Sequence, residues 1–376
     1  MKQVMFVMAA CLAVAVSVAA KTATTPDTTP PAEKENPLTF GASYTGDMVA
    51  NLSGGIKRGG TYMGLANLTL HFDTEKAGWW KGGELYIKGG NSHGGEASAN
   101  LIGDFQKASN IEAGNHTFLY ELWYRQQLGP VSLCVGLQDL NADYASSSNG
   151  ALFNNSYFGI HSVCSENVPA PVYPLTALAL NVHWQIADHW HWRTAFFDGR
   201  PDPFEQNPYN VKWSLTANQG YLALTELEWD GSLVKGLAGS YKLGTYYHHS
   251  PITEVTHNYG FYIVADQDIT RQISLFTQIG FSPKEYNNHF FCAGGGGTFK
   301  NFSRKRPDDM IGLAANHACF RHSPGGHETV IEAIYHFQAT KQIYFRPDLQ
   351  YIIHPSGTDQ RLDNALVATL RMGFEF

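Results

Sequence analysis

Residues 366–376, LVATLRMGFEF, end the chain with an apolar side chain at every second position. A period of two places those side chains on one face of a β-strand and leaves the other face to residues such as Thr369, Arg371 and Glu375. The same alternation runs back to Leu38 in segments of about ten residues, the length typical of strands that cross a membrane. The clearest further segments are 343–353, 178–186, 190–196, 221–229 and 118–124, the last with Phe118, Tyr120, Leu122 and Tyr124 on one face. The chain is therefore predicted to be all-β.

The composition excludes several classes of protein. Hydrophobic residues make up 43% of the 376 residues, aromatic residues 13% and charged residues only 16%. So many aromatic residues and so few charges exclude a disordered chain. Past the leader no apolar run reaches about 18 residues, which excludes a helical membrane protein. The net charge of −7 gives no support for nucleic-acid binding.

Strand alternation fits either a soluble sandwich with an apolar core or a membrane barrel with an apolar outside. Three features favour the membrane barrel. Short connections alternate with long ones, and the chain ends on an aromatic residue that closes an alternating strand. Aromatic residues also stand at segment ends, where a membrane interface requires them: Trp184, Trp190, Trp229, Tyr351 and Phe376.

The predicted fold is a transmembrane antiparallel β-barrel of about 16 strands around a water-filled lumen. An even number of strands returns both termini to the periplasmic side. The boundaries are least certain between residues 282 and 320. The strands are predicted near 38–50, 61–73, 82–92, 116–128, 131–138, 175–186, 190–198, 219–229, 233–247, 258–267, 272–281, 290–299, 309–319, 328–338, 342–353 and 364–376.

The N-terminal residues are predicted to direct export. Residues 1–20 combine a basic start, an apolar run and small residues at Val18-Ala19-Ala20, which is typical of a cleaved signal peptide. Residues 21–37 are rich in Thr and Pro, hold no apolar residue larger than Ala before Leu38, and are predicted to be a disordered linker. The barrel domain would then span 38–376, in the outer membrane of a Gram-negative bacterium.

Several segments, in this order and spacing, resemble the carbohydrate-selective porins of the OprB family. They are 136–141 (GLQDLN), 153–158 (FNNSYF), Tyr173-Pro174, 197–203 (FDGRPDP) and 346–357 (RPDLQYIIHPSG). The resemblance spans nearly the whole chain after the leader. It implies a 16-stranded outer-membrane barrel that passes sugars by diffusion, with neutral sugars such as glucose as the expected solutes. A general diffusion porin without sugar preference is the alternative, and a purely structural barrel with a blocked lumen is a third.

The longest connection, 139–173, is the candidate for a loop that enters the lumen, because loops longer than about 15 residues are usually functional or disordered. A loop that covers the surface without entering the lumen is the other possibility. Sugar selectivity needs a constriction, aromatic faces and groups that bind hydroxyls. The loop offers Asn154, Asn155, Tyr157 and Phe158 as tentative constriction residues.

Inward strand faces offer charged and polar side chains that would line the pore. Guanidinium groups and carboxylates both bind hydroxyls, although each such residue can equally form a structural ion pair in the lumen. The first candidates are Arg125, Arg193, Arg346 and Asp348. The further candidates are Glu121, His183, His191, Glu226 and Arg371.

Four cysteines, Cys134, Cys164, Cys292 and Cys319, remain after the leader, and an even number in an exported protein permits disulfides. Cys292 and Cys319 are predicted at the same end of adjacent strands, so a bridge between them is one hypothesis. A bridge from Cys134 to Cys164 would fasten the long loop to the wall.

No other chemistry is indicated by the sequence. The sixteen histidines show no recognised metal-ligand spacing, and neither HExxH nor GxSxG is present. The four glycines at 294–297 lack the Lys-Ser/Thr of a phosphate loop and are predicted to make room in the barrel wall. The expected protein has no enzymatic activity, cofactor or metal, lies in outer-membrane lipid, and is a monomer or a homotrimer.

Overall fold

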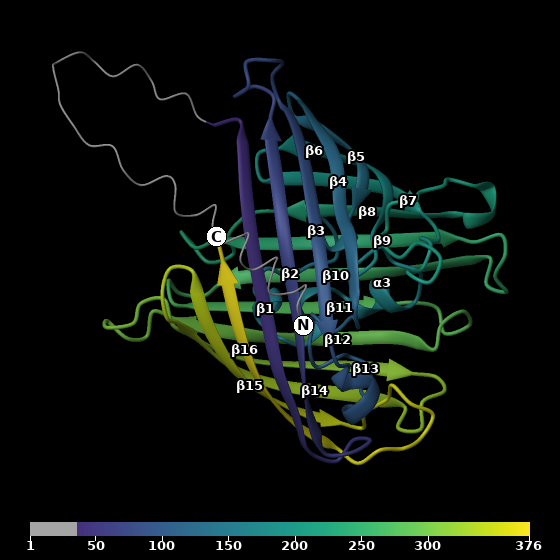
Figure 1. Cartoon of the computed structure of the whole chain (residues 1–376), viewed down its shortest axis with the longest axis vertical. Helices are drawn as coiled ribbons and strands as arrows, with labels where there is room; N and C mark the ends of the chain where they lie inside the picture. Colours follow the sequence, from purple (N-terminus) through teal and green to yellow (C-terminus); the bar gives the residue numbers. More distant parts are fainter. Residues whose placement is uncertain (1–35) are drawn as a thin grey trace, which may run out of the picture. The chain divides into compact units, whose positions relative to one another are not determined.

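The computed structural model describes residues 36–376, so the predicted signal peptide and nearly all of the predicted linker lie outside the described residues. Residues 38–375 form a closed barrel of sixteen antiparallel strands in which β1 pairs with β16 (Figure 1). The strands are β1 Leu38–Ser53, β2 Gly59–Asp73, β3 Gly83–Gly94, β4 His116–Leu128, β5 Val131–Gln138, β6 Ala177–Ala187, β7 Trp190–Asp198, β8 Tyr221–Trp229, β9 Gly239–His249, β10 His257–Asp268, β11 Ile273–Phe281, β12 His289–Lys300, β13 Met310–Phe320, β14 His327–Gln338, β15 Ile343–Ile353 and β16 Ala365–Glu375.

The fold class and the number of strands predicted from the sequence are confirmed. Even β12 and β13, in the least certain region, begin and end within one residue of their predicted bounds. The largest error is at β9, which begins at Gly239 rather than near 233. Residues 234–237 form a turn instead, closed by a hydrogen bond from the Leu237 amide to the Val234 carbonyl oxygen and followed by the new strand.

The two ends of the barrel differ. One end, here called the turn end, carries the start of β1, the end of β16 and short connections such as Gly129-Pro130. The other, the loop end, carries the long connections. Apolar side chains point outward from the wall, among them Leu68, Leu243 and Leu313. Aromatic side chains are exposed near both ends, with Trp184, Trp190 and Phe376 toward the turn end and Tyr62, Tyr221, Tyr247 and Tyr351 toward the loop end.

The sequence pattern predicted Phe118, Tyr120, Leu122 and Tyr124 on one outward face of β4. This prediction is wrong for Phe118 and Tyr120. Strand β4 contains a β-bulge, because Lys88 pairs with Glu121 whereas the next residue, Gly89, pairs with Leu119. The extra residue, Tyr120, interrupts the alternation. Phe118 and Tyr120 are consequently buried against the lumen loops, where both contact Tyr173, instead of facing outward with Leu122 and Tyr124.

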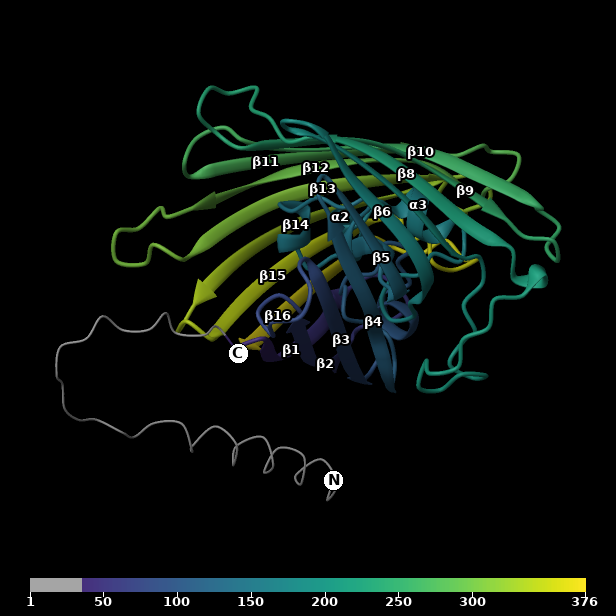
Figure 2. The same cartoon turned by 90° about the horizontal axis from the view of Figure 1, so that it is seen from above.

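Two connections occupy much of the lumen (Figure 2). The first inserted loop, residues 95–115, joins β3 to β4. The second inserted loop, residues 139–176, joins β5 to β6. Their short helices are η1 Ser98–Ile102 in the first loop and η2 Leu140–Ala142, η3 Gly150–Leu152, α2 Ser156–Gly159 and α3 Ser162–Glu166 in the second, while η4 Ala217–Gln219 lies after β7.

No helix within residues 36–376 combines the length and the apolar character needed to cross a membrane.

Small residues in the wall make space for the second inserted loop. A Cβ atom at Gly280 would lie 2.1 Å from Cε1 of His161, and one at Gly312 would lie 2.9 Å from Cζ of Phe153. Helix α3 packs against β10, β11 and β12. The wall therefore has glycines, Gly280 and Gly312, at two positions where the second inserted loop lies closest to it.

The substitution Gly280→Ala is expected to displace His161 and with it α3, because the new methyl group would overlap the imidazole ring. Overpacking of this kind costs about 1–3 kcal/mol. Thermal unfolding followed by gel mobility should show a lower midpoint than for the unmodified protein. The matched control is Gly89→Ala, whose Cβ would meet its nearest atom at 3.9 Å. Equal midpoints for the two variants would contradict this account of Gly280.

Candidate functional site

Carboxylates of the wall hold the second inserted loop by its backbone. Glu226 on β8 accepts a hydrogen bond from the Ala145 amide at 3.0 Å. Asp266 on β10 accepts from the Ser147 hydroxyl at 2.7 Å and from the Asn149 amide at 3.0 Å. These contacts lie first on β8 and then on β10, so the loop follows the inner wall away from β5.

The same loop is held again on the far side of the barrel. Glu332 on β14 accepts hydrogen bonds from the amides of Asn154, at 2.6 Å, and Asn155, at 3.1 Å. The side-chain amide of Asn155 also donates to Gln350 on β15 at 3.2 Å. The loop thus starts at β5 and crosses the lumen to reach β15.

The first inserted loop uses the same kind of contact. Glu328 on β14 accepts from the amides of Phe105, at 2.8 Å, and Gln106, at 2.9 Å. The Asn110 amide donates to the Asn154 carbonyl oxygen at 2.8 Å, which joins the two loops. Together they form one barrier across the lumen.

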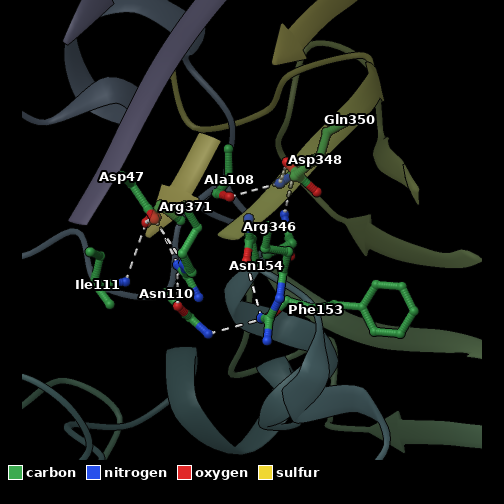
Figure 3. A network of polar contacts seen from close by, with 12 residues as sticks. Asp47, Ala108, Asn110, Ile111, Phe153, Asn154, Arg346, Asp348, Gln350 and Arg371 are labelled. Carbon is green, nitrogen blue, oxygen red and sulfur yellow. Dashed lines mark hydrogen bonds and ion pairs between the residues drawn. The ribbon is translucent and has the colours of Figure 1, made fainter. Parts of the chain in front are cut away.

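Arg371 is held between a strand and the first inserted loop (Figure 3). Its Nε and Nη2 atoms donate to the two carboxylate oxygens of Asp47, each at 2.7 Å, and Nη2 also donates to Asn110 at 2.8 Å. Ser109 donates to the same Asp47 at 2.7 Å. Arg371 and Asp47 are both buried, so this pair fastens the loop to β1 and β16 and leaves little charge for a solute.

Arg346 and Asp348 on β15 also lie beneath the loops. Arg346 is 7% exposed, donates to the Asn154 side chain at 3.4 Å and contacts His336 at 3.2 Å. Asp348 lies near Glu332 and accepts from Gln350 at 3.1 Å. Figure 3 shows both side chains directed into the loop contacts. The structure thus places these two predicted pore residues in the anchoring network.

The side chains predicted to form the constriction are buried in packing contacts and are not exposed to the lumen. Asn154, Asn155, Tyr157 and Phe158 are all buried, and Phe158 packs against Phe276 of β11 with ring centroids 6.0 Å apart. Asn154, Asn155 and Phe158 turn toward the wall, and Tyr157 packs against Phe105 of the first inserted loop. The loop therefore narrows the lumen by its bulk and its backbone. The aromatic faces of Tyr157 and Phe158 are therefore not available to stack on a sugar.

An open cavity of about 120 Å³ remains on the turn-end side of the second inserted loop. It brings together three of the predicted residues, Arg125, His183 and Arg193, from β4, β6 and β7. The remaining lining residues are Ser132, Cys134, Asp143 and Asn181. Of these, Asp143 comes from the loop and is bound to the wall by the Asn181 side-chain amide at 2.7 Å.

The two arginines of this cavity differ in their surroundings. Arg193 forms ion pairs with Glu226 at 3.2 Å and with Glu228 at 2.5 Å. Arg125 forms no ion pair with a carboxylate among residues 36–376, and its guanidinium lies 4.6 Å from the centroid of the Trp123 ring. Arg125 is therefore the cation of the cavity whose charge is least neutralised.

An aromatic pair adjoins Arg125. Trp123 stacks on Tyr86 of β3 with centroids 5.0 Å apart and planes inclined by 27°. The indole nitrogen donates to Glu121 at 3.1 Å, and Glu121 in turn lies 3.9 Å from the Lys88 ammonium. Glu121, a predicted pore residue, thus orients the indole at the edge of the cavity.

Histidines extend the polar wall toward the turn end. The ring of His183 contacts that of His191 at 3.3 Å, and His191 contacts Asp230 at 3.2 Å. Within residues 36–376, no three His, Cys, Asp or Glu side chains are grouped in a way that would hold a metal ion.

Neither predicted disulfide is present, and Cys134, Cys164, Cys292 and Cys319 are all free thiols. In the β12–β13 register Cys292 pairs with Ala318, and Cys319 pairs with Phe291. Successive side chains point to opposite faces, so Cys292 is buried inside whereas Cys319 lies outside. Cys134 lines the open cavity, whereas Cys164 packs in the apolar cluster that includes Cys292, on the other side of the second loop.

Sequence reasoning missed the carboxylates that anchor the loops, Asp47, Asp266, Glu328 and Glu332, and it missed the first inserted loop as a lumen element. The alternation within the predicted strands held a signal for the carboxylates, because it places Glu328 and Glu332 on the inward face of β14. The sequence gives no indication of which loop amides these carboxylates accept, because every residue except proline carries a backbone amide.

A closed sixteen-strand barrel with a polar lumen narrowed by inserted loops is the architecture of a porin. Residues 57–376 match the carbohydrate-selective porin, OprB family, and the chain belongs to that family, as its resemblance predicted. Family and fold are those of channel proteins.

Known relatives agree with this assignment. The chain is 26% identical over 405 residues to Porin B of Pseudomonas aeruginosa, covering 89% of this chain and 86% of that protein. A high-pH structure of Pseudomonas putida OprB superposes with a TM-score of 0.80 at 23% identity, over 90% of this chain and 94% of the other. The outer membrane channel DcaP of Acinetobacter baumannii shares the fold with a TM-score of 0.57 at 9% identity, over 90% and 97% of the two chains.

The substitution Glu332→Ala is expected to loosen the second inserted loop, because Asn154 and Asn155 would lose their shared acceptor. A hydrogen bond to a charged group contributes about 1.5–3 kcal/mol, so the population of the released loop should rise about tenfold or more. Planar-bilayer recordings should show larger or more frequent wide openings. The control is Glu254→Ala on the exposed β9–β10 connection. Conductance equal to that of the control would contradict the anchoring role.

Acid is also expected to favour release of the second inserted loop. Burial, with the nearby His289, lowers the pKa of His161 to about 3. A lowered pKa means that the inserted loop binds fewer protons than the released loop, so this contribution to insertion is complete above pH 6.5 and is lost as the pH falls. Release should become up to about 100-fold more favourable between pH 6.5 and 4.5.

The variant His161→Asn tests this titration, because the Asn side chain can still accept the Val163 amide that His161 Nδ1 accepts at 3.3 Å. Single-channel conductance of the unmodified protein should increase at pH 4.5 relative to pH 7, and the variant should lack that part of the response. An identical pH response in both proteins would assign the effect to other groups.

Proposed function

We propose that the protein is a passive outer-membrane channel through which sugars, with neutral sugars such as glucose as the principal class, enter the periplasm. The observation that carries this proposal is the open polar cavity below the inserted loops, in a chain that belongs to a carbohydrate-selective porin family. The solute gradient would drive transport without cofactor or catalysis. Export by the predicted signal peptide and contact with outer-membrane lipid are parts of the same proposal.

The chemistry of the cavity suits an uncharged solute with many hydroxyl groups. Arg125 and Arg193 supply N–H donors, Asp143 supplies an acceptor, and Asn181 supplies both. Arg193 already has two carboxylate partners, so its charge is largely neutralised. Neutral solutes with donors and acceptors can exchange water for these groups without bringing an unpaired charge into the narrow part of the channel.

The Trp123–Tyr86 pair adds an apolar surface beside those polar groups. A pyranose ring presents C–H groups on its faces and hydroxyls at its rim. The aromatic pair next to Arg125 therefore matches the two kinds of surface that a sugar carries. An amino acid of similar size carries two charges and has no comparable face.

Liposome swelling should separate the possible functions. Faster entry of glucose than of an equally sized amino acid supports the sugar channel, whereas equal rates would assign the protein to general diffusion porins. Entry of neither solute would indicate a structural barrel with a blocked lumen.

The substitution Arg125→Ala is expected to weaken the binding of sugar in the lumen, because it removes the least neutralised cation from the cavity. Loss of one hydrogen bond to a charged group corresponds to about a tenfold rise in the sugar concentration that half-blocks the ion current. Arg271→Ala, on the exposed β10–β11 turn, is the matched control. Unchanged block with Arg125→Ala would remove that residue from the solute pathway.

A further inference from the structure

The wall has a gap beside β4. Strand β5 is only eight residues long and ends at Gln138, whose partner on β6 is Ala177. Pairing between β4 and β5 stops at Leu122 opposite Leu137. Residues 116–121 of β4 therefore have no β5 partner on that side.

The connection after β7 reaches this gap and bonds to β4 there. Its residues 207–215, here called the strap, lie beside β4 (Figure 2). The Leu119 amide donates to the Tyr209 carbonyl oxygen at 2.9 Å, and the Asn210 side chain donates to the Leu119 carbonyl oxygen at 3.3 Å. The same side chain donates to the Thr176 hydroxyl at 3.1 Å, so Asn210 joins the strap to the end of the second inserted loop, just before β6.

These bonds are formed at the depth of the lipid-facing wall. Leu119 pairs with Gly89, and Gly89 pairs with Leu68 on the next strand. Leu68 points outward and stands six residues nearer the turn end than Tyr62, an aromatic residue exposed near the loop end. An open strand edge at that depth would leave backbone groups unpaired in hydrocarbon, which costs several kcal/mol for each group.

The strap exposes four apolar side chains, here called its apolar face. Tyr209, Val211, Trp213 and Leu215 are 62%, 52%, 39% and 70% exposed. Asn207 fixes a turn in this segment, because its side-chain oxygen accepts the amides of Val211 at 3.1 Å and Lys212 at 3.2 Å. Lys212 and Trp213 lie beside the start of β6, where they line a small pocket with Ala177 and Leu178.

We propose that the strap is a membrane-embedded part of the wall whose apolar face binds the acyl chains of the leaflet at the loop end. The proposal rests on the membrane location proposed above. Acyl chains are the occupant because the strap lies at the depth of outward-facing Leu68 and because its bonds to β4 seal a strand edge there. The strap thus replaces the missing half of β5, and Asn210 supplies hydrogen bonds that a paired strand would have made.

Nitroxide labels in liposomes can test this proposal. Val211→Cys and Leu215→Cys would carry the label on the apolar face, in a Cys319→Ser background that removes the outward thiol. Lys212→Cys, one residue away and also exposed, is the matched control. Relaxation by oxygen relative to relaxation by a water-soluble nickel chelate should be about tenfold higher at 211 and 215 than at 212, because a polar chelate is excluded from hydrocarbon.

Two results would overturn the proposal. Equal ratios at 211, 212 and 215 would place the strap in water, and strong spin–spin coupling at 211 would show that a second copy of the chain covers it. A label at Leu349→Cys, on the outward face of β15, reports separately whether the barrel lies in lipid. If that label is exposed to nickel, the membrane location fails; if it is protected while 211 is not, only the strap proposal fails.

Discussion

The structure depends on hydrogen bonds from loop backbone amides to carboxylates of the barrel wall. A loop placed inside a barrel buries its N–H groups away from the strands that would normally pair with them, and an unpaired buried N–H is costly. Glu226, Asp266, Glu328 and Glu332 provide the acceptors, and each receives at least one loop amide. A charged acceptor strengthens such a bond, so a few side chains are enough to hold a connection of nearly forty residues in place. The carboxylates of the barrel wall thus determine where the loops lie in the lumen.

This anchoring divides the lumen into two regions. The inserted loops pack against the wall from β8 round to β16, where Gly280 and Gly312 leave room for His161 and Phe153 and where Arg371 is neutralised by Asp47. The open cavity lies on the side bounded by β4–β7 and toward the turn end. Charged residues therefore serve two purposes. Those on the filled side position the loops, and those on the open side remain within reach of a solute.

The fold could be predicted from the sequence to within a few residues, because a period of two on sixteen segments is a direct consequence of lipid on one face and water on the other. The prediction failed where the period is broken locally, as at the Tyr120 bulge, because an extra residue in one strand has no compositional signature. The inward direction of Arg125, Arg193 and Arg346 also followed from alternation. The different environments of these three arginines could not be predicted, because alternation shows which face a side chain lies on but not which residues pack against it. The two cysteine bridges failed for a related reason, since Cys292 and Cys319 are neighbours in register but lie on opposite faces.

The balance of charge in the open region supports the proposed passage of uncharged solutes through a channel with many arginines. Arg193 has two carboxylate partners, Lys88 lies near Glu121, and Asp143 faces the same cavity as Arg125. Each cation is thus paired or has an acid nearby, and the field along the passage stays weak. The lining of the open region therefore has many hydrogen-bond donors and acceptors but little net charge. Such a lining would discriminate by hydrogen bonding and by the aromatic surface of Trp123, which are the properties in which the proposed sugar solutes differ most from a salt ion or an amino acid.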